Sequence, residues 1–293
     1  MKEDIDMDVI SRIEENYDKM SKGHKSIARF VLAHFEKAAF MNVSRLSEVT
    51  GVSEATVVRF STELGYEKYQ QFQKAVLEYA KTRLTSVQRM DIAYERMENE
   101  GILTSVLNSD IDKIRSTLAA IDEDEFNRAV EKIAKARRVY IIGLGSASAL
   151  ASFLGYYLNL IFDDVRIINS VGVSEIIDQL YRVSSDDVVI GISFPRYSNR
   201  TVNALKYAKS IGGTVVGVTD GAMSPIKETA DYCLYARSDM ESFVDSLVAP
   251  FSLMNALIVA LGARKKETVY KKLEDLESIW KQYKVYETTK EEK

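Results

Sequence analysis

The chain has 293 residues, of which 46% are hydrophobic and 28% charged, a composition that excludes disorder or fibrous structure as its main state. Its net charge is −4, so the chain as a whole lacks the positive charge that favours nucleic acid. The average hides a split, because residues 19–90 contain 12 Lys and Arg against 6 Asp and Glu. One basic segment is therefore embedded in an otherwise acidic protein.

Cysteine and histidine are too few to suggest disulfide or metal chemistry. Cys233 is the one cysteine, and both histidines, His24 and His34, are far from it in sequence, so we expect no disulfide, metal or cofactor. The N-terminus lacks a signal-peptide core, and the longest apolar stretch, around 247–261, is interrupted by Pro250 and polar residues. We therefore expect a cytoplasmic protein that does not enter the membrane.

Apolar periodicity divides the chain into a helical first part and a mixed second part. Residues 1–80 show helical spacing and no proline, which predicts an all-α N-terminal domain. Residues 81–112 are expected to form a helical linker, and residues 113–285 a separate domain in which strands and helices alternate.

The segment from Ser44 to Gly65 is typical of a helix-turn-helix. Ser44 is expected to cap the first helix and Ser53 the second, because serine at these positions accepts a hydrogen bond from the first helical turn. Gly51 suits the positive φ of a tight turn, and Gly65 is expected to end the second helix. Within that helix, Val57 and Phe60 fall on one face with Leu64 and predict a buried stripe.

The opposite face of the second helix is small, hydroxylated and basic, as entry into a DNA major groove requires. Arg59 is predicted to approach base edges, while serine and threonine lie near phosphates. A purely structural helical hairpin is the alternative interpretation of the same spacing. The residues predicted to contact double-stranded operator DNA are Ser44, Ser53, Glu54, Ala55, Thr56 and Arg59.

After residue 138 the pattern changes to short apolar runs separated by helical stretches. Such runs are typical of buried parallel strands. The alternation predicts a doubly wound five-stranded parallel sheet, closed by helices near 243–261 and 266–284. The expected strands are 139–143, 165–169, 188–192, 215–219 and 232–235.

Two loops that follow predicted strands are rich in glycine and hydroxyl groups. The first begins at Gly143 and the second at Ser193, and each leads into a predicted helix whose N-terminus favours an anion. A nicotinamide cofactor is disfavoured, because Ser148 stands where a dinucleotide motif has its third glycine. An unliganded glycine turn remains an alternative. The residues predicted to bind a phosphorylated effector are Gly145, Ser146, Ser148, Ser193, Arg196, Ser198 and Thr201.

The two halves together resemble the RpiR family of bacterial transcriptional regulators, which join a helix-turn-helix domain to a sugar isomerase (SIS) domain. The resemblance covers nearly the whole chain and is carried by Gly51-Val-Ser-Glu-Ala-Thr-Val-Val-Arg59-Phe, by Gly143-Leu-Gly145-Ser146 and by Ile192-Ser193. It implies a regulator of carbohydrate or amino-sugar metabolism that binds a sugar phosphate. It also implies a homodimer or higher homo-oligomer that reads a palindromic operator.

One loop departs from the family pattern. A SIS phosphate loop usually reads Ser-x-Ser-Gly-x-Thr, whereas Ser193 is followed here by Phe194-Pro195-Arg196-Tyr197-Ser198. Losing the glycine is expected to keep the backbone further from a phosphate. A bound anion is then expected to shift toward Arg196 and Ser198, or the ligand is of another type.

Two further functions remain open from the sequence. The first is a phosphosugar isomerase or lyase, whose base would be a carboxylate such as Glu175 or Glu241, because the second half contains no histidine. The second is a regulator whose SIS domain only dimerises.

Overall fold

Short helices make up most of the described part of residues 8–97 in this computed structural model, which describes residues 8–81, 83–97, 101–170, 172–240 and 242–286. The chain folds into two compact units, Met1–Val106 with Asp239–Asp245, and Leu107–Ser238 with Ser246–Lys293. The helices of the first unit are α1 (Val9–Asn16), α2 (Lys22–Ala33), α3 (Phe35–Ala38), α4 (Val43–Thr50), α5 (Glu54–Glu63), α6 (Tyr69–Lys81) and α7 (Ser86–Met97), with a 3₁₀ turn at Tyr17–Lys19.

Aromatic and aliphatic side chains from these helices form one closed core. Phe60 on α5 meets the ring of Phe72 on α6 edge to face, with centroids 5.6 Å apart, and Ile27 on α2 is fully buried in the same core. The predicted stripe of Val57, Phe60 and Leu64 is confirmed, since all three are at most 4% exposed. The apolar side of α5 is thus fixed inside the unit, and its other side faces outward.

A segment distant in sequence completes the first unit. Met240 packs against the helical core, and Asp245 forms an ion pair with Arg89 on α7, whose side chain is 2% exposed. Met240 and Asp245 both follow the last strand of the second unit in the sequence. The first unit is therefore built from two separate pieces of the chain.

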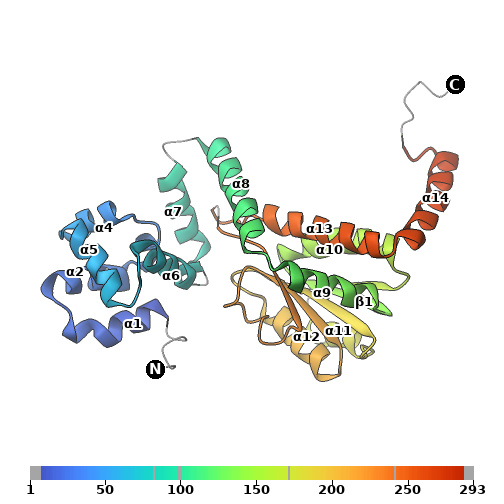
Figure 1. Cartoon of the computed structure of the whole chain (residues 1–293), viewed down its shortest axis with the longest axis horizontal. Helices are drawn as coiled ribbons and strands as arrows, with labels where there is room; N and C mark the ends of the chain where they lie inside the picture. Colours follow the sequence, from blue (N-terminus) through green and yellow to red (C-terminus); the bar gives the residue numbers. More distant parts are fainter. Residues whose placement is uncertain (1–7, 82, 98–100, 171, 241, 287–293) are drawn as a thin grey trace. The chain divides into compact units, whose positions relative to one another are not determined.

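The second unit is a five-stranded parallel sheet with helices on both faces, as predicted (Figure 1). Its strand order is β2-β1-β3-β4-β5. The strands are β1 (Arg138–Gly143), β2 (Val165–Ile168), β3 (Asp187–Ile192), β4 (Thr214–Thr219) and β5 (Tyr232–Tyr235). The helices are α9 (Glu123–Ala134), α10 (Ala147–Ile161), α11 (Val173–Leu180), α12 (Asn199–Ser210), α13 (Val248–Arg264) and α14 (Lys266–Tyr283), while α8 (Ile102–Ala120) runs from the first unit into the second.

Alternate residues of each strand serve two separate cores, because side chains in a strand point to opposite faces in turn. Val139 and Ile141 of β1 pack in the core under α9, α10 and α13. Tyr140 and Ile142 pack in the core under α11 and α12. Cys233 is a small buried residue, 3% exposed, as expected.

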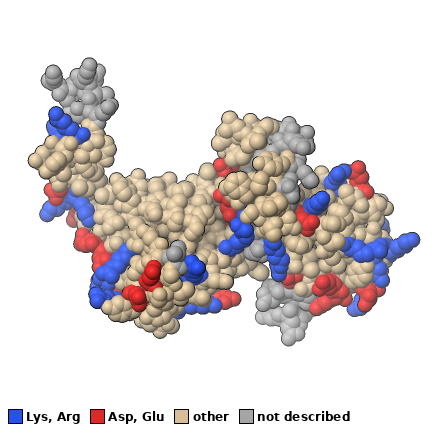
Figure 2. Space-filling model, turned by 180° about the vertical axis from the view of Figure 1, so that it is seen from behind, with Lys and Arg blue, Asp and Glu red and all other residues tan. Residues whose placement is uncertain are grey.

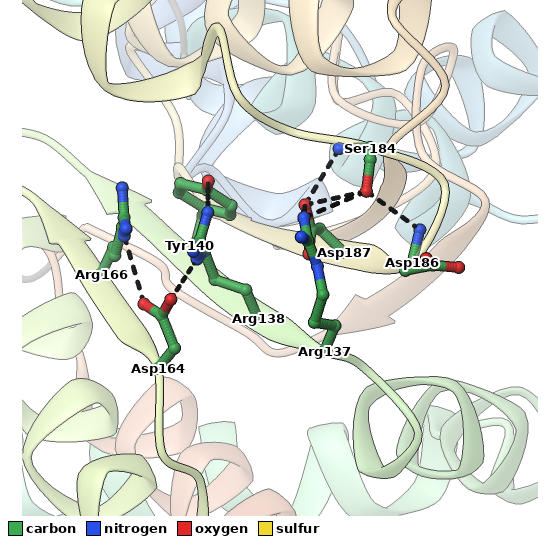
Figure 3. Close-up of polar contacts among 8 residues, drawn as sticks. All are labelled: Arg137, Arg138, Tyr140, Asp164, Arg166, Ser184, Asp186 and Asp187. Atoms are coloured by element: carbon green, nitrogen blue, oxygen red, sulfur yellow. Dashed lines mark hydrogen bonds and ion pairs between the residues drawn. The ribbon is translucent and has the colours of Figure 1, made fainter.

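Charged groups close the amino end of the sheet (Figure 3). Asp187 is fully buried and accepts hydrogen bonds from Arg137 Nε at 3.0 Å, from Arg137 Nη2 at 2.8 Å and from the Ser184 backbone N–H at 2.9 Å. Asp164 bridges Arg138 and Arg166 on the neighbouring strands. Hydrogen bonds from arginine and from a backbone N–H satisfy these two buried or half-buried carboxylates. The two carboxylates therefore stabilise the amino end of the sheet.

Several predicted boundaries were wrong: β1, β3 and β4 each begin one residue earlier than predicted, and further ends differ. The helix expected near 243–261 begins only at Val248, which places Pro250 in its first turn, where the missing N–H costs no helical hydrogen bond. The second strand ends at Ile168, one residue before the predicted Asn169.

Candidate functional site

The helix-turn-helix forms where the sequence predicts it, with one correction at its first cap. The side chain of Asn42, not of Ser44, accepts the hydrogen bond that caps α4, from the Arg45 N–H at 2.8 Å. Ser44 instead lies in the first turn of α4 and is exposed. Gly51 takes the predicted positive φ, 67°, so the chain turns tightly between α4 and α5.

The N-terminus of α5 is held rigidly by its own hydroxyl groups. Ser53 accepts a hydrogen bond from the Thr56 N–H at 3.2 Å, and the two hydroxyl oxygens are 2.8 Å apart. Ala55 and Arg59 are exposed on the side of α5 opposite its core stripe, and Glu54 is exposed on the flank of that stripe. These three predicted DNA-facing residues are therefore accessible on the first half of α5.

A second exposed arginine of the helix-turn-helix, Arg45, was not among the residues predicted from the sequence. Arg45 on α4 is 59% exposed at its side chain and pairs with Glu48 at 2.6 Å. It lies in the helix that precedes the turn, where docked helix-turn-helix proteins cross the DNA backbone. An exposed Arg near the start of the first helix was the signal available in the sequence.

The two glycine- and serine-rich loops begin side by side in the second unit. Gly143 at the end of β1 is the register partner of Ile192 at the end of β3, so the loops that follow leave the sheet at the same edge. The strand order reverses its direction between β1 and β3. Open α/β sheets bind ligands at such a switch point, outside the carboxyl ends of the strands.

In the first loop, the two predicted serines differ in their local bonding. Ser148 donates its hydroxyl proton to the Gly145 carbonyl at 2.7 Å. Ser146 is the N-cap residue of α10, its side chain makes no capping hydrogen bond, and the residue is exposed. Gly145 has a φ of 64°, which turns the backbone toward the start of α10. Ser146 is thus the serine whose hydroxyl is accessible at a helix N-terminus.

In the second loop, Arg196 stands where the family pattern has glycine. Arg196 has a φ of 58°, although such a conformation is unfavourable for a residue with a Cβ atom. Its side chain is exposed. Ser193 accepts from the Ser198 N–H at 3.0 Å, and Ser198 accepts from the Thr201 N–H at 3.3 Å. The substituted loop is therefore ordered around its own serines.

Two of the predicted ligand residues are buried, Thr201 fully and Ser193 with 4% exposed. Within the part of the chain that the structure describes, the Thr201 hydroxyl has no hydrogen-bond partner. Of the carboxylates considered as catalytic bases, Glu175 is exposed at the start of α11, and Glu241 lies outside the described residues.

A polar network beside the second loop was not predicted. Asp220, directly after β4, is 8% exposed and accepts hydrogen bonds from the Tyr197 hydroxyl at 2.8 Å and from the Thr219 hydroxyl at 3.2 Å. The Thr219 and Ser224 hydroxyl oxygens are 2.7 Å apart. Thr-Asp after an apolar run was the sequence signal for this network, which fixes the loop after β3 against the end of β4.

Two other kinds of site are absent from the described residues. Over residues 8–286, outside the four short gaps, no cluster of three or more His, Cys, Asp or Glu side chains has a metal-binding arrangement. In those same ranges no helix has both the length and the apolar character needed to span a membrane.

Comparison with known proteins identifies both halves. Residues 7–83 match the helix-turn-helix domain of the rpiR family, and residues 132–260 match the SIS domain. An uncharacterised HTH-type transcriptional regulator of Thermotoga maritima is 28% identical over 278 residues, which cover 90% of this chain and 95% of that protein. A regulator of the same description from Clostridium perfringens is 25% identical and covers 77% and 80% of the two chains.

Solved structures agree with this assignment. The sugar isomerase domain of an RpiR transcription factor from Sphaerobacter thermophilus is 28% identical, with a TM-score of 0.57 over 60% of this chain and 97% of that one. Vibrio vulnificus NanR, solved with ManNAc-6P, has the same fold over 94% of this chain and 99% of its own, with a TM-score of 0.58 and 21% identity. The chain belongs to the RpiR family of HTH-type transcriptional regulators that carry a SIS domain.

Proposed function

We propose that this regulator binds operator DNA through α5 and that a sugar phosphate at the carboxyl edge of its sheet changes its affinity for DNA. One observation carries the effector half of the proposal: two anion-type loops begin at the register partners Gly143 and Ile192, at the switch point of the sheet. NanR, which shares the fold, was solved with a sugar phosphate, and this supports the ligand class. The regulated genes would serve carbohydrate or amino-sugar metabolism.

The phosphate would lie at the N-terminus of α10. The backbone N–H groups at the start of a helix and the helix dipole favour an anion there, and Ser146 adds a hydroxyl donor. The exposed guanidinium of Arg196 would approach from the second loop, where it can form two parallel hydrogen bonds with phosphate oxygens. Gly145, Ser148, Ser193 and Ser198 would shape the two loops around it.

Coupling between the two functions follows from linkage. An effector that binds one conformation of a homodimer more tightly shifts the population toward that conformation, with its own operator affinity. The proposed regulator catalyses no reaction. It would act in the cytoplasm, where the operator DNA lies. Turnover of a sugar phosphate that disappears in Glu175→Gln would contradict the non-enzymatic part.

The effector half is tested by thermal unfolding of the full chain with phosphorylated sugars, their unphosphorylated parents and inorganic phosphate. A ligand that binds only the folded state raises the melting temperature. We expect stabilisation by a sugar phosphate that neither its parent nor phosphate reproduces, and its loss in Ser146→Ala but not in Ser210→Ala, at the far end of α12. If no sugar phosphate shifts the transition at millimolar concentration, the SIS domain serves only for dimerisation or binds another class of molecule.

The DNA half is tested by fluorescence anisotropy with the DNA upstream of the gene and with random duplex. Removing an arginine that reads a base costs about 1–3 kcal/mol, or roughly 5- to 150-fold in affinity, and relaxes specificity. We expect this from Arg59→Ala and much less from Arg29→Ala, which removes an exposed arginine from α2. Equal binding of the wild type to both duplexes at physiological salt would refute DNA recognition.

A further inference from the structure

The outer face of α5 carries apolar groups where an exposed helix face normally carries charged and polar ones. At helical spacing, the side away from the core stripe holds Ala55, Val58, Arg59 and Thr62. All four are exposed, Val58 at 42%. Figure 2 shows charged side chains of both signs on the surface of both units, whereas this face of α5 offers one charge and three uncharged side chains.

The fold does not explain the valine at position 58. Val58 is not among the side chains that pack in or against the helical core. Valine is a poorer helix former than alanine or lysine, because its branched Cβ restricts the side chain in a helix. An exposed valine here therefore lowers helix stability and adds no core packing. Residues that depart from what their fold needs are expected at functional sites.

Thr62 extends the apolar surface of Val58, because its hydroxyl is used inside the helix. Thr62 Oγ1 donates a hydrogen bond to the Val58 carbonyl at 3.1 Å. The γ-methyl group of this exposed residue is then the part of the side chain left to contact a ligand. Positions three and four apart are neighbours on a helix surface, so Ala55, Val58 and Thr62 form one strip of methyl groups beside Arg59.

We propose that this methyl strip, centred on Val58, contacts the C5-methyl group of thymine in the major groove. Thymine is the base that presents a methyl group at the major-groove edge, and apolar side chains recognise it there. Arg59, next to the strip, suits the two acceptors of guanine. The inference rests on the proposed binding of DNA through α5 and adds the base chemistry that this helix reads. The expected operator has thymine close to the base that Arg59 contacts.

The surroundings of the methyl strip favour DNA over an apolar protein partner. Residues 19–90 contain 12 Lys and Arg against 6 Asp and Glu, and phosphates line both sides of a major groove. Arg45, in the helix before the turn, is also exposed. The strip itself consists of three short side chains, a small area compared with the apolar patches that mark protein interfaces. A narrow apolar strip within a basic segment is complementary to a base edge between two phosphate backbones.

The test compares thymine with deoxyuridine, which lacks only the C5-methyl group. Fluorescence anisotropy measures binding of the full chain to duplexes of the DNA upstream of the gene, in which thymines are replaced by deoxyuridine one at a time. Burial of one methyl group is worth roughly 3- to 5-fold in affinity, and we expect at least one replacement to weaken wild-type binding by that factor. The same replacement should leave binding by Val58→Ala nearly unchanged, because this variant lacks both γ-methyl groups.

Val87→Ala is the matched control. It truncates a valine that is 68% exposed on α7 and should remain as sensitive to deoxyuridine as the wild type. Because alanine favours the helix and Val58 is exposed, thermal unfolding should show Val58→Ala to be at least as stable as the wild type.

Two results would overturn this inference and leave the proposed function intact. In the first, the wild type prefers the upstream duplex to random DNA but is insensitive to every deoxyuridine replacement. In the second, Val58→Ala keeps every sensitivity of the wild type. Equal binding of the wild type to upstream and random duplexes would refute the proposed DNA recognition and this inference together.

Discussion

Replacing Asp187 by asparagine is the most direct test of what holds the amino end of the sheet together. The substitution keeps the size of the side chain and removes its negative charge. Asp187 is fully buried at the start of β3 and accepts two hydrogen bonds from Arg137 and one from the Ser184 N–H. In the Asp187→Asn variant an NH₂ donor replaces one of the two carboxylate oxygens and faces these donors. The amide therefore loses the charge and at least one accepted hydrogen bond.

The loss of stability in Asp187→Asn depends on the burial of Asp187 and on the partial exposure of its partner Arg137. Breaking a fully buried ion pair costs about 3–5 kcal/mol, but the Arg137 side chain is 54% exposed and regains water when its partner is neutral. We therefore expect Asp187→Asn to lower the free energy of unfolding by about 2–3 kcal/mol at pH 7. At roughly 2–4 °C per kcal/mol for a unit of this size, the melting temperature should fall by about 5–10 °C.

The stabilisation that Asp187 contributes depends on pH, and its direction follows from the pKa of this carboxyl group. Burial by itself would raise the pKa of Asp187, but hydrogen bonds from Arg137 and Ser184 and the charge of Arg137 outweigh it and lower the pKa below its ordinary value. A carboxyl with a lowered pKa in the folded state stabilises the protein above its unfolded-state pKa, about 4. That stabilisation is lost as the pH falls through the folded-state pKa.

Thermal unfolding followed by circular dichroism at pH 7, 5 and 3 tests this reasoning. The difference between wild type and Asp187→Asn should be full at pH 7 and shrink at pH 3. Asp164→Asn is the matched control, because Asp164 also pairs with arginines but is 36% exposed, and it should cost under about 1 kcal/mol. A loss that is equal at all three pH values, or equal in the two variants, would refute the role assigned to burial.

Five further substitutions test three local features. Asn42→Ala should lower the free energy of unfolding by about 1 kcal/mol through loss of the α4 cap, whereas Ser44→Ala should change it by less than about 0.5 kcal/mol; urea titration of both decides which residue caps the helix. Arg196→Gly should not destabilise the protein, and Arg196→Val should cost about 1–2 kcal/mol because its φ is positive; equal stability of the two variants would contradict the left-handed loop. Thr201→Val should leave stability unchanged or raise it by up to about 1 kcal/mol, because the buried hydroxyl has no partner among the described residues; a clear loss in thermal unfolding would show that the hydroxyl is bonded in solution.

The sequence was sufficient for the features that depend on local chemistry. Gly51 and Ser53 predicted the turn and the second cap, because a left-handed turn and a helix start each favour a few residue types. Short apolar runs predicted all five strands, since a strand buried on both faces has few polar positions.

Other features depend on contacts that the sequence does not display. Asn42 and Ser44 are both good caps, and the choice between them depends on where the chain enters α4. The left-handed conformation of Arg196 depends on the loop around it, because no local preference of arginine favours it. The network around Asp220 joins the ends of β3 and β4, which are adjacent only once the sheet has formed.

The two-piece construction of the first unit has a consequence for synthesis on the ribosome. Arg89 emerges long before its partner Asp245, and a ribosome adding about 5–20 residues per second needs on the order of 10 s to cover the distance between them. During that time the guanidinium lacks this counter-charge, so the first unit is incomplete until most of the second has been made. A truncated product that ends within the second unit would therefore lack a finished first unit as well, which limits the release of a partial regulator that could still occupy DNA.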